Sequence, residues 1–257
     1  MPRKAREKSQ SGIYHVILRG ANRQEIFHED EDSLRFLEIV DKNAKISEMK
    51  VFGWCLMGNH VHLLLGEGVE ELSVTMKRIG VSFAWYYNWK YKTTGHLFQD
   101  RFRSENVEND GYLLTVIRYI HQNPVKAGMV KLAEDWKWSS CHNYYSKTPY
   151  SLVLLDRDLI LTMFSTDRPR AIAMFKEFSE VESDSNCIDD EQRSRMTDED
   201  AELEITKKIA GIEIAQVKSL PKRQRDEVLR KVKKIEGVTH RQAARIFGVS
   251  PNLIFKA

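Results

Sequence analysis

Short apolar runs alternate with longer amphipathic segments over about the first 147 residues. The short runs are rich in β-branched and aromatic residues and predict strands at residues 14–18, 51–57 and 60–65 and an extended segment at 97–107. The longer segments predict helices at residues 30–48, 70–91 and 110–122. Gly58-Asn59 is a turn signal, so the strands beside it should pair as a hairpin. We expect Asp110 to cap the third helix and Asn123-Pro124 to end it.

The pattern changes after Tyr150, where only helical spacing of apolar positions remains. Residues 156–164 and 171–178 predict helices, and the acidic, serine-containing stretch 179–200 predicts a linker before a basic helical block. We therefore divide the chain into a mixed domain, a helical and acidic linker region and a basic helical domain, at residues 1–150, 151–200 and 201–257.

The composition of the 257 residues excludes disorder throughout, because 42% are hydrophobic and the net charge is only +3. No apolar run approaches the roughly 18 residues of a membrane span. The first ten residues lack the apolar region of a secretory signal. Cys55, Cys141 and Cys187 are scattered without metal-ligand spacing and predict reduced thiols. We therefore expect a cytoplasmic protein without a membrane partner.

Charge is unevenly distributed along the chain. Residues 218–257 hold 11 basic and 3 acidic side chains, whereas residues 177–205 hold 12 acidic and 2 basic ones. Arg3, Lys4 and Arg6 form a basic N-terminal arm. This distribution favours a polyanionic partner. On charge alone, however, solvated helix faces are the commoner explanation.

Two histidines follow the predicted turn. Because side chains alternate across a strand, His60 and His62 project from one face and Val61 from the other. Two neighbouring imidazoles can chelate one divalent cation. A bare His-x-His pair is more often two polar side chains on the solvent face of an edge strand. The pair alone therefore does not establish a metal site.

A second pair of candidate residues lies on the third predicted helix. Tyr119 and Asn123 are four positions apart and occupy one face. A phenol, with a pKa of about 10, needs activation to act as a nucleophile, and a metal or metal-bound phosphate supplies it. The Asn123 amide oxygen would complete a His, His, Asn cation site beside Tyr119. The alternative is a tyrosine packed on the sheet and an asparagine that caps the helix.

Together, the two pairs resemble the REP-associated tyrosine transposases of the single-tyrosine HUH endonuclease superfamily (His, hydrophobic residue, His). The resemblance covers about residues 10–147, and the C-terminal helices with their Gln-Ala-Ala-Arg block resemble longer members. The segments that carry it are Tyr14–Gln24, Met57–Leu65, Gly95–Phe102, Tyr119–Gly128 and Trp138–Ser140.

The resemblance implies a transposase that cleaves and rejoins single-stranded DNA at palindromes folded as hairpins. His60, His62 and Asn123 would bind Mg²⁺ or Mn²⁺, and Tyr119 would attack the scissile phosphate in line. The product would be a 5′-phosphotyrosine link and a free 3′-hydroxyl. The target sequence, the physiological metal and the choice between a monomer and a homodimer are left open by the sequence.

Basic and aromatic residues are candidates for DNA contacts. Those expected at phosphates or a groove are Arg101, Arg103 and Arg118 near the cleaved bond, and Arg3, Lys4 and Arg6 in the N-terminal arm. The aromatic residues between Trp85 and Tyr91 are candidates for stacking on unpaired bases, although aromatics at helical spacing more often belong to the core.

The C-terminal block predicts a helix-turn-helix. Thr239 can cap its first helix, residues 248–250 form the turn, and Pro251 begins the second helix. Arg241 and Arg245 are its candidate DNA contacts. The second helix has about two turns at most, which argues against sequence readout, and packing against another protein is the competing use.

We therefore expect an α+β fold: an antiparallel, RRM-like sheet that carries the histidine pair, with helices on one face, as in HUH transposases, and a C-terminal all-helical extension with the helix-turn-helix. The alternative function is a non-catalytic nucleic-acid-binding regulator on the same fold. Only a missing nucleophile or metal ligand would favour it, and all four positions are occupied. A structural zinc protein is disfavoured because the chain lacks a Cys/His quartet.

Overall fold

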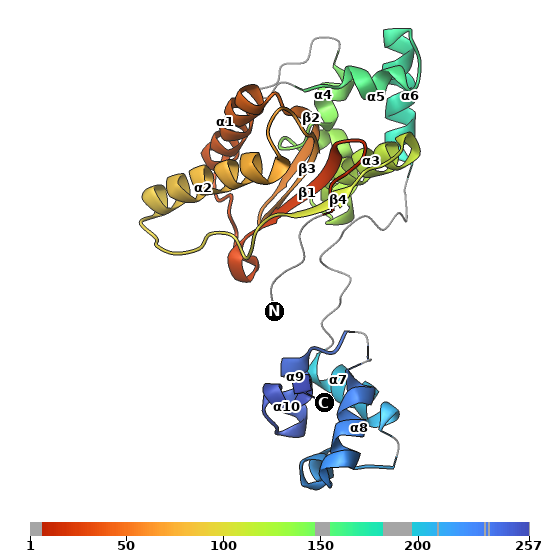
Figure 1. Ribbon diagram of the computed structural model, residues 1–257. Coiled ribbons are helices and arrows are strands. Elements are labelled where there is room, and N and C mark those ends of the chain that lie inside the picture. Colours follow the sequence, from red (N-terminus) through yellow and green to blue (C-terminus); the bar gives the residue numbers. More distant parts are fainter. Residues whose placement is uncertain are drawn as a thin grey trace. The chain divides into compact units, whose positions relative to one another are not determined.

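A four-stranded antiparallel sheet organises the N-terminal part of the chain (Figure 1). Its strands, in the spatial order β2-β3-β1-β4, are β1 (Ile13–Arg19), β2 (Lys50–Met57), β3 (His60–Gly66) and β4 (Arg103–Asn106). Helices α1 (Asp30–Ser47) and α2 (Leu72–Tyr91) connect β1 to β2 and β3 to β4. This β-α-β-β-α-β order with β1 and β3 in the centre is the ferredoxin-like arrangement. The predicted α+β class is confirmed, and the expected extended segment 97–107 contributes only β4 as a regular strand.

The computed structural model describes residues 7–146, 155–181, 197–209, 211–233, 235 and 237–256. Two expectations fall outside these ranges. They are the basic arm with Arg3, Lys4 and Arg6, and residues 182–196 of the predicted acidic linker.

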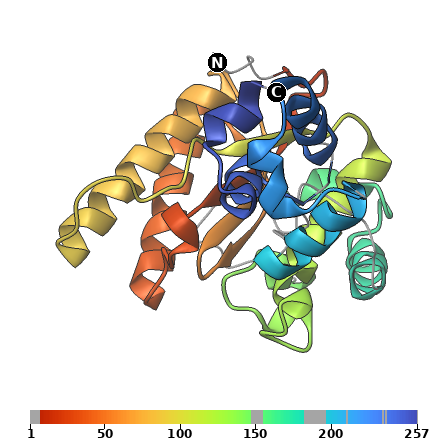
Figure 2. The same cartoon turned by 90° about the horizontal axis from the view of Figure 1, so that it is seen from below.

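Both faces of the sheet are covered, so the expectation of helices on one face only was wrong (Figures 1 and 2). On one side, Val61, Leu63 and Leu65 of β3 pack in a core with α1 and α2. On the other side, Leu64 of β3 and Cys55 of β2 pack with a second set of helices. The second core forms because alternate positions on both sides of these strands are apolar. The helices of this second side are α3 (Asp110–Lys126), α4 (Cys141–Tyr145), α5 (Asp158–Thr162) and α6 (Arg168–Glu180).

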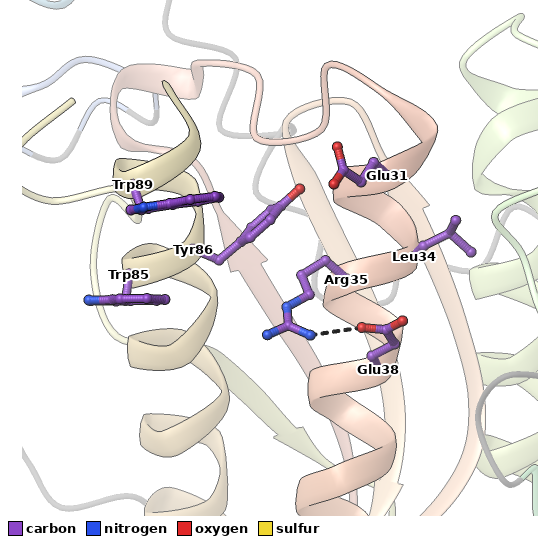
Figure 3. A pocket seen from close by; sticks show the side chains of 7 residues that line it. All are labelled: Glu31, Leu34, Arg35, Glu38, Trp85, Tyr86 and Trp89. Carbon is purple, nitrogen blue, oxygen red and sulfur yellow. Dashed lines mark hydrogen bonds and ion pairs between the residues drawn. The ribbon is translucent and has the colours of Figure 1, made fainter. Parts of the chain in front are cut away.

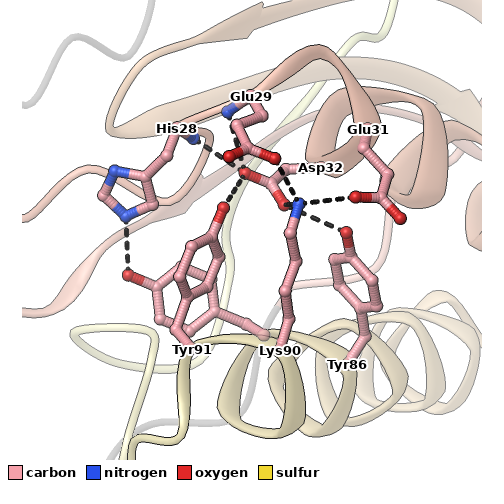
Figure 4. A network of polar contacts seen from close by, with 8 residues as sticks. His28, Glu29, Glu31, Asp32, Tyr86, Lys90 and Tyr91 are labelled. Carbon is pink, nitrogen blue, oxygen red and sulfur yellow. Dashed lines mark hydrogen bonds and ion pairs between the residues drawn. The ribbon is translucent and has the colours of Figure 1, made fainter.

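Asp32, in the first turn of α1, holds this helix against the end of α2 (Figure 4). Its fully buried carboxylate accepts hydrogen bonds from the backbone N–H groups of the two residues before α1. It also accepts hydrogen bonds from the hydroxyls of Tyr86 and Tyr91, at 3.0 and 2.7 Å, and Lys90 Nζ lies 2.8 Å away. Burial opposes ionisation, but these donors, led by Lys90, lower the pKa of Asp32 to about 2.

Helix α3 begins and ends differently from the sequence prediction. Asn109, rather than Asp110, caps it by accepting a hydrogen bond from a backbone N–H of the first turn. Pro124 lies inside the last turn, where its missing N–H removes a single helical hydrogen bond. Gly128, at φ +69°, ends the helix, and the N–H of Met129 bonds to the Pro124 carbonyl at 2.9 Å. This Schellman motif, and not the proline, sets the C-terminus.

The chain divides into two compact units, residues 1–188 and 189–257. The boundary falls within the region 151–200, and α5 and α6 pack in the first unit. The second unit has its own apolar core, which includes Ile205, Leu229 and Phe247. Its helices are α7 (Asp198–Lys208), α8 (Lys222–Val232), α9 (His240–Phe247) and α10 (Pro251–Lys256), and short 3₁₀ segments lie at Ala21–Arg23, Ala133–Asp135 and Ile214–Ser219.

The ends of α9 follow the sequence prediction. The Thr239 side chain caps α9 by accepting a hydrogen bond from the Gln242 N–H, and Gly248, at φ +62°, terminates it. Pro251 is the first residue of the six-residue α10. Within the part of the chain that the structure describes, none of the helices has the length and apolar character needed to cross a membrane.

Candidate active site

The pairing register of the central strands places three histidines on the α3 side of the sheet. Ile17 of β1 lies opposite His62 of β3, and Arg19 lies opposite His60. Because alternate residues share a face, His15 lies on the same side as Ile17 and Arg19. The ring centroids of His60 and His62 are 5.0 Å apart, and those of His15 and His62 are 5.3 Å apart.

Hydrogen bonds determine which nitrogen of His60 carries the proton. Asn59 Nδ2 donates to the Arg23 carbonyl, which turns its Oδ1 towards His60. This oxygen lies 2.6 Å from His60 Nδ1. Since an amide oxygen can only accept, Nδ1 of the neutral ring carries the proton and Nε2 keeps its lone pair. His60 therefore presents Nε2 as a ligand atom.

His62 is fully buried, and its Nδ1 lies 3.1 Å from His15 Nε2. Its Nε2 has no hydrogen-bond partner among the described residues. Burial, followed by the charges of His60, His15 and Arg19, lowers the pKa of His62 well below its ordinary value of 6.5. The ring is therefore neutral at neutral pH, the state in which an imidazole binds a metal.

Tyr119 brings α3 to this cluster. Its ring contacts His15 and His62 edge-on, with centroid distances of 5.8 and 5.7 Å. Asn123, one turn later, donates from Nδ2 to the Tyr119 carbonyl at 2.9 Å. Lys126 Nζ lies 5.2 Å from the centre of the Tyr119 ring. The predicted nucleophile and the predicted histidine pair thus meet on one side of the sheet.

The donor atoms of this cluster fit a divalent cation as a partial set of ligands. Across the described residues, no three His, Cys, Asp or Glu side chains form a group that could hold a metal ion. Two imidazole nitrogens are present, and the buried Nε2 of His62 has no other partner among the residues described. An amide oxygen from Asn123 and phosphate oxygens would have to supply further ligands, and oxygen ligands suit Mg²⁺ and Mn²⁺.

The arginines expected at phosphates lie in three different surroundings. Arg103 of β4 is exposed and lies opposite Ile17, in the same cross-strand row as His62. Arg101 is exposed and lines a cavity of about 910 Å³ between α2 and residues 95–102. The Arg118 guanidinium lies 4.3 Å from the centre of the Phe178 ring of α6. Contact with DNA stays a prediction for all three.

In the second unit, the two candidate arginines of α9 differ. Arg241 is exposed. Arg245 forms a two-pronged ion pair with Asp198 of α7, at 2.5 and 2.9 Å, and this carboxylate raises the pKa of Arg245. Arg245 is therefore already partly neutralised within its own unit.

The aromatic cluster of α2 splits between core and surface. Phe83, Tyr86 and Tyr87 are buried, as expected for aromatics at helical spacing. Trp85 and Trp89 are 68% and 70% exposed and point away from the core. They line a shallow pocket of about 380 Å³ together with Glu31, Leu34, Arg35 and Glu38 of α1 (Figure 3).

Sequence reasoning missed His15, Arg19 and Lys126. The alternation of His15, Ile17 and Arg19 along β1 was visible, but the side of the sheet that they occupy depends on pairing between strands distant in sequence. Lys126 was missed because the predicted helix ended before it, whereas α3 carries it one further turn along the face of Tyr119 and Asn123.

Comparisons with known proteins agree with the site. Residues 8–123 match the family model described as transposase IS200 like. A protein of Haemophilus influenzae described as a REP-associated tyrosine transposase is 29% identical over 100 residues, which cover 34% of this chain and 56% of that protein. The REP-associated tyrosine transposase of Escherichia coli K12 is 27% identical over 105 residues, which cover 40% of this chain and 61% of that protein.

The chain thus spans less than two thirds of the length of either curated relative. A solved structure of a REP-associated tyrosine transposase bound to a REP hairpin covers 59% of this chain and 90% of its own, with a TM-score of 0.47 and 22% identity. The resemblance to REP-associated tyrosine transposases that the sequence predicted is confirmed by the family model and the two relatives.

Proposed function

We propose that this protein is a transposase that cleaves and rejoins single-stranded DNA at hairpin sequences through a 5′-phosphotyrosine intermediate. The observation that carries the proposal is the edge-on contact of Tyr119 with His15 and His62. This contact joins a nucleophile on a helix to a pair of ligand imidazoles on a strand. The family match of residues 8–123 supports the same reaction class.

Each residue of the cluster has a distinct role in the proposed reaction. His60 and His62, with Asn123, hold a divalent cation. When bound, the cation supplies Lewis-acid polarisation of the scissile phosphate. Tyr119 is the nucleophile, and the Lys126 ammonium beside its ring favours negative charge on the phenol oxygen.

The chemical step is a transesterification at phosphorus. A bond forms between Tyr119 Oη and phosphorus while the bond from phosphorus to the 3′-oxygen breaks. The phenol gives up its proton, and the leaving 3′-oxygen takes one up. Because the phosphotyrosine is also a diester, attack by a 3′-hydroxyl reverses the step and rejoins a strand without a nucleotide cofactor.

The strand state of the substrate tests this proposal. An in-line attack needs a scissile phosphate open on both sides, so we expect cleavage of single-stranded DNA that carries a hairpin and little or no cleavage of the same sequence in full duplex. The product should carry the protein on its 5′ end, as a gel shift that survives boiling in detergent and is lost on proteolysis. Tyr119→Phe should abolish this adduct and keep hairpin binding.

Two outcomes would reject the proposal in different ways. Cutting of fully paired duplex to a free 5′-phosphate, without an adduct, would indicate a hydrolytic nuclease that uses water at the histidine pair. Hairpin binding without cleavage at any Mg²⁺ or Mn²⁺ concentration would instead favour a non-catalytic nucleic-acid-binding regulator on the same fold.

A further inference from the structure

His15 is a buried histidine beside the candidate active site that the proposed reaction does not use. It lies on β1, is fully buried, and its ring stacks on His62 with 24° between the planes. Its Nε2 lies 3.1 Å from His62 Nδ1. Its Nδ1 lies 3.9 Å from Glu105 Oε2, which is longer than a hydrogen bond but within the range of an ion pair. His15 therefore contacts His62 through the nitrogen that is not the ligand atom.

The proton between the two rings can be arranged in two ways. If His15 donates it, the neutral His62 carries its own proton on Nε2, and no lone pair is left there for a metal. If His62 donates it, Nε2 of His62 keeps its lone pair, and His15 carries its own proton on Nδ1, towards the Glu105 carboxylate.

Two features favour the arrangement in which His62 donates. It directs the Nδ1 proton of His15 towards a negative carboxylate, whereas the other directs a lone pair there. It also gives His62 the arrangement of His60, whose Nδ1 donates to Asn59. Both ligand candidates then present Nε2.

We infer that His15 is a positioning residue, which accepts the Nδ1 proton of His62 and so holds Nε2 of that ring as a ligand for the divalent cation. Metal-binding histidines commonly donate their second nitrogen to a carboxylate or carbonyl, and loss of that acceptor costs about 10- to 100-fold in metal affinity. Here the acceptor is an imidazole with Glu105 behind it. The cation rests on the proposed function, whereas the direction of the hydrogen bond does not.

The direction of the hydrogen bond can be measured without metal or DNA. In the full chain with ¹⁵N-labelled histidine, long-range proton–nitrogen correlations of the imidazoles distinguish the two neutral tautomers, and the signals of His62 are assigned by their loss in His62→Gln. We expect the Nδ1–H tautomer. An Nε2–H tautomer at His62 would overturn the positioning role, whatever the protein does to DNA.

The effect on the ligand atom is tested by titrating Mn²⁺, followed by electron paramagnetic resonance. The full chain carries Tyr119→Phe and is bound to a hairpin oligonucleotide, so the DNA stays intact. His15→Leu removes the acceptor and should weaken Mn²⁺ binding about 10- to 100-fold. His15→Gln keeps an acceptor near the position of Nε2 and should stay within about threefold of the parent.

His121→Leu is the matched control, because His121 is equally buried but bonds to Ser140 Oγ, away from His62. It should leave Mn²⁺ affinity unchanged. Unchanged affinity in His15→Leu, or equal losses in His15→Leu and His121→Leu, would overturn the positioning role. Failure of the parent itself to bind Mn²⁺ would instead reject the cation of the proposed function.

Discussion

The two sides of the sheet each bury a polar cluster, and the clusters differ in how their polar atoms are satisfied. On the α1/α2 side, Asp32 accepts four hydrogen bonds from hydroxyl and backbone groups and pairs with Lys90. On the α3 side, His62 Nε2 and His15 Nδ1 are buried without a hydrogen-bond partner among the described residues. A satisfied network stabilises a fold, whereas an unsatisfied atom costs free energy until a ligand binds it. The comparison assigns stability to the first cluster and chemistry to the second.

An unsatisfied atom alone does not define a site. His121 Nδ1 is also buried without a partner in the described part of the chain, and burial lowers the pKa of His121 to about 3. Its ring lies beside Tyr144 and Phe175, so only aromatic packing surrounds it on that side. What distinguishes the cluster at His62 is a second imidazole ligand and a tyrosine in ring contact.

The largest effect is expected from His60→Ala. Loss of one cation ligand removes several kcal/mol of Lewis-acid stabilisation, which corresponds to a fall in the cleavage rate of at least about 100-fold. The free energy of unfolding in EDTA should change by less than about 1 kcal/mol, because a single hydrogen bond to Asn59 is lost. Oligonucleotide cleavage and urea unfolding measure the two effects. Wild-type cleavage in excess chelator would remove the cation from the mechanism.

The residues of this site show how much local sequence could predict. The common face of His60 and His62 follows from strand alternation, and that of Tyr119 and Asn123 from helical spacing, so both pairs were predicted correctly. That the pairs meet, and that His15 joins them, depends on strand register and on packing of α3 against the sheet. Those contacts are long-range and leave no local pattern.

Local rules failed where two of them competed. A proline usually ends a helix, yet α3 passes Pro124 because one missing hydrogen bond costs little in a last turn that Gly128 closes. On α2, helical spacing could have separated buried Tyr86 and Tyr87 from exposed Trp85 and Trp89, but composition alone groups all four as aromatic. Helices on both faces were missed because apolar residues at alternate positions of β2 were not assigned to a second core.

The next largest effect concerns the satisfied cluster. Asp32→Asn leaves Lys90 and two hydroxyls facing a neutral amide, and should lower the free energy of unfolding by about 3 kcal/mol. The cleavage rate per folded molecule should stay unchanged. Glu38→Gln, which removes an exposed ion pair with Arg35 on the same helix, is the control and should cost less than about 0.5 kcal/mol. Equal losses in both variants would contradict the role of Asp32.

The same pair of proteins carries a pH dependence. The pKa of Asp32 is lowered from 3.8 to about 2, so its stabilisation is fully present above pH 3.8 and is lost as the pH falls through about 2. The difference in unfolding free energy between wild type and Asp32→Asn should be constant from pH 7 to about 4 and shrink by about 2 kcal/mol below that. A difference that already shrinks between pH 7 and 5 would assign the stability to another group.

A smaller effect is expected from the second unit. Deleting residues 189–257 removes the basic block but leaves both catalytic pairs, so hairpin affinity at about 0.1 M salt should fall roughly tenfold, with a shallower salt dependence. Cleavage at saturating DNA should survive. Arg241→Gln should reduce the salt dependence more than Arg245→Gln, whose arginine is paired with Asp198. Unchanged affinity at every salt concentration would instead make this unit a protein-binding one.

The smallest effect is expected at the exposed tryptophans of the α1/α2 side. Stacking of a base is worth about 1–3 kcal/mol, but it would bring phosphates close to Glu31 and Glu38 (Figure 3). The nearby cations are already paired, Arg35 with Glu38 and Lys90 with Glu31, each at 2.9 Å.

We therefore expect Trp85→Ala to change hairpin affinity by less than about twofold in a fluorescence anisotropy titration, since the repulsion offsets the stacking. Trp89→Ala should behave alike. A tenfold loss in either variant, together with quenching of tryptophan fluorescence by the hairpin in the wild type, would show that DNA binds on this side as well. The division of the sheet into a stabilising side and a reactive side would then fail, because α2 would present bases to the protein while α3 presents the nucleophile.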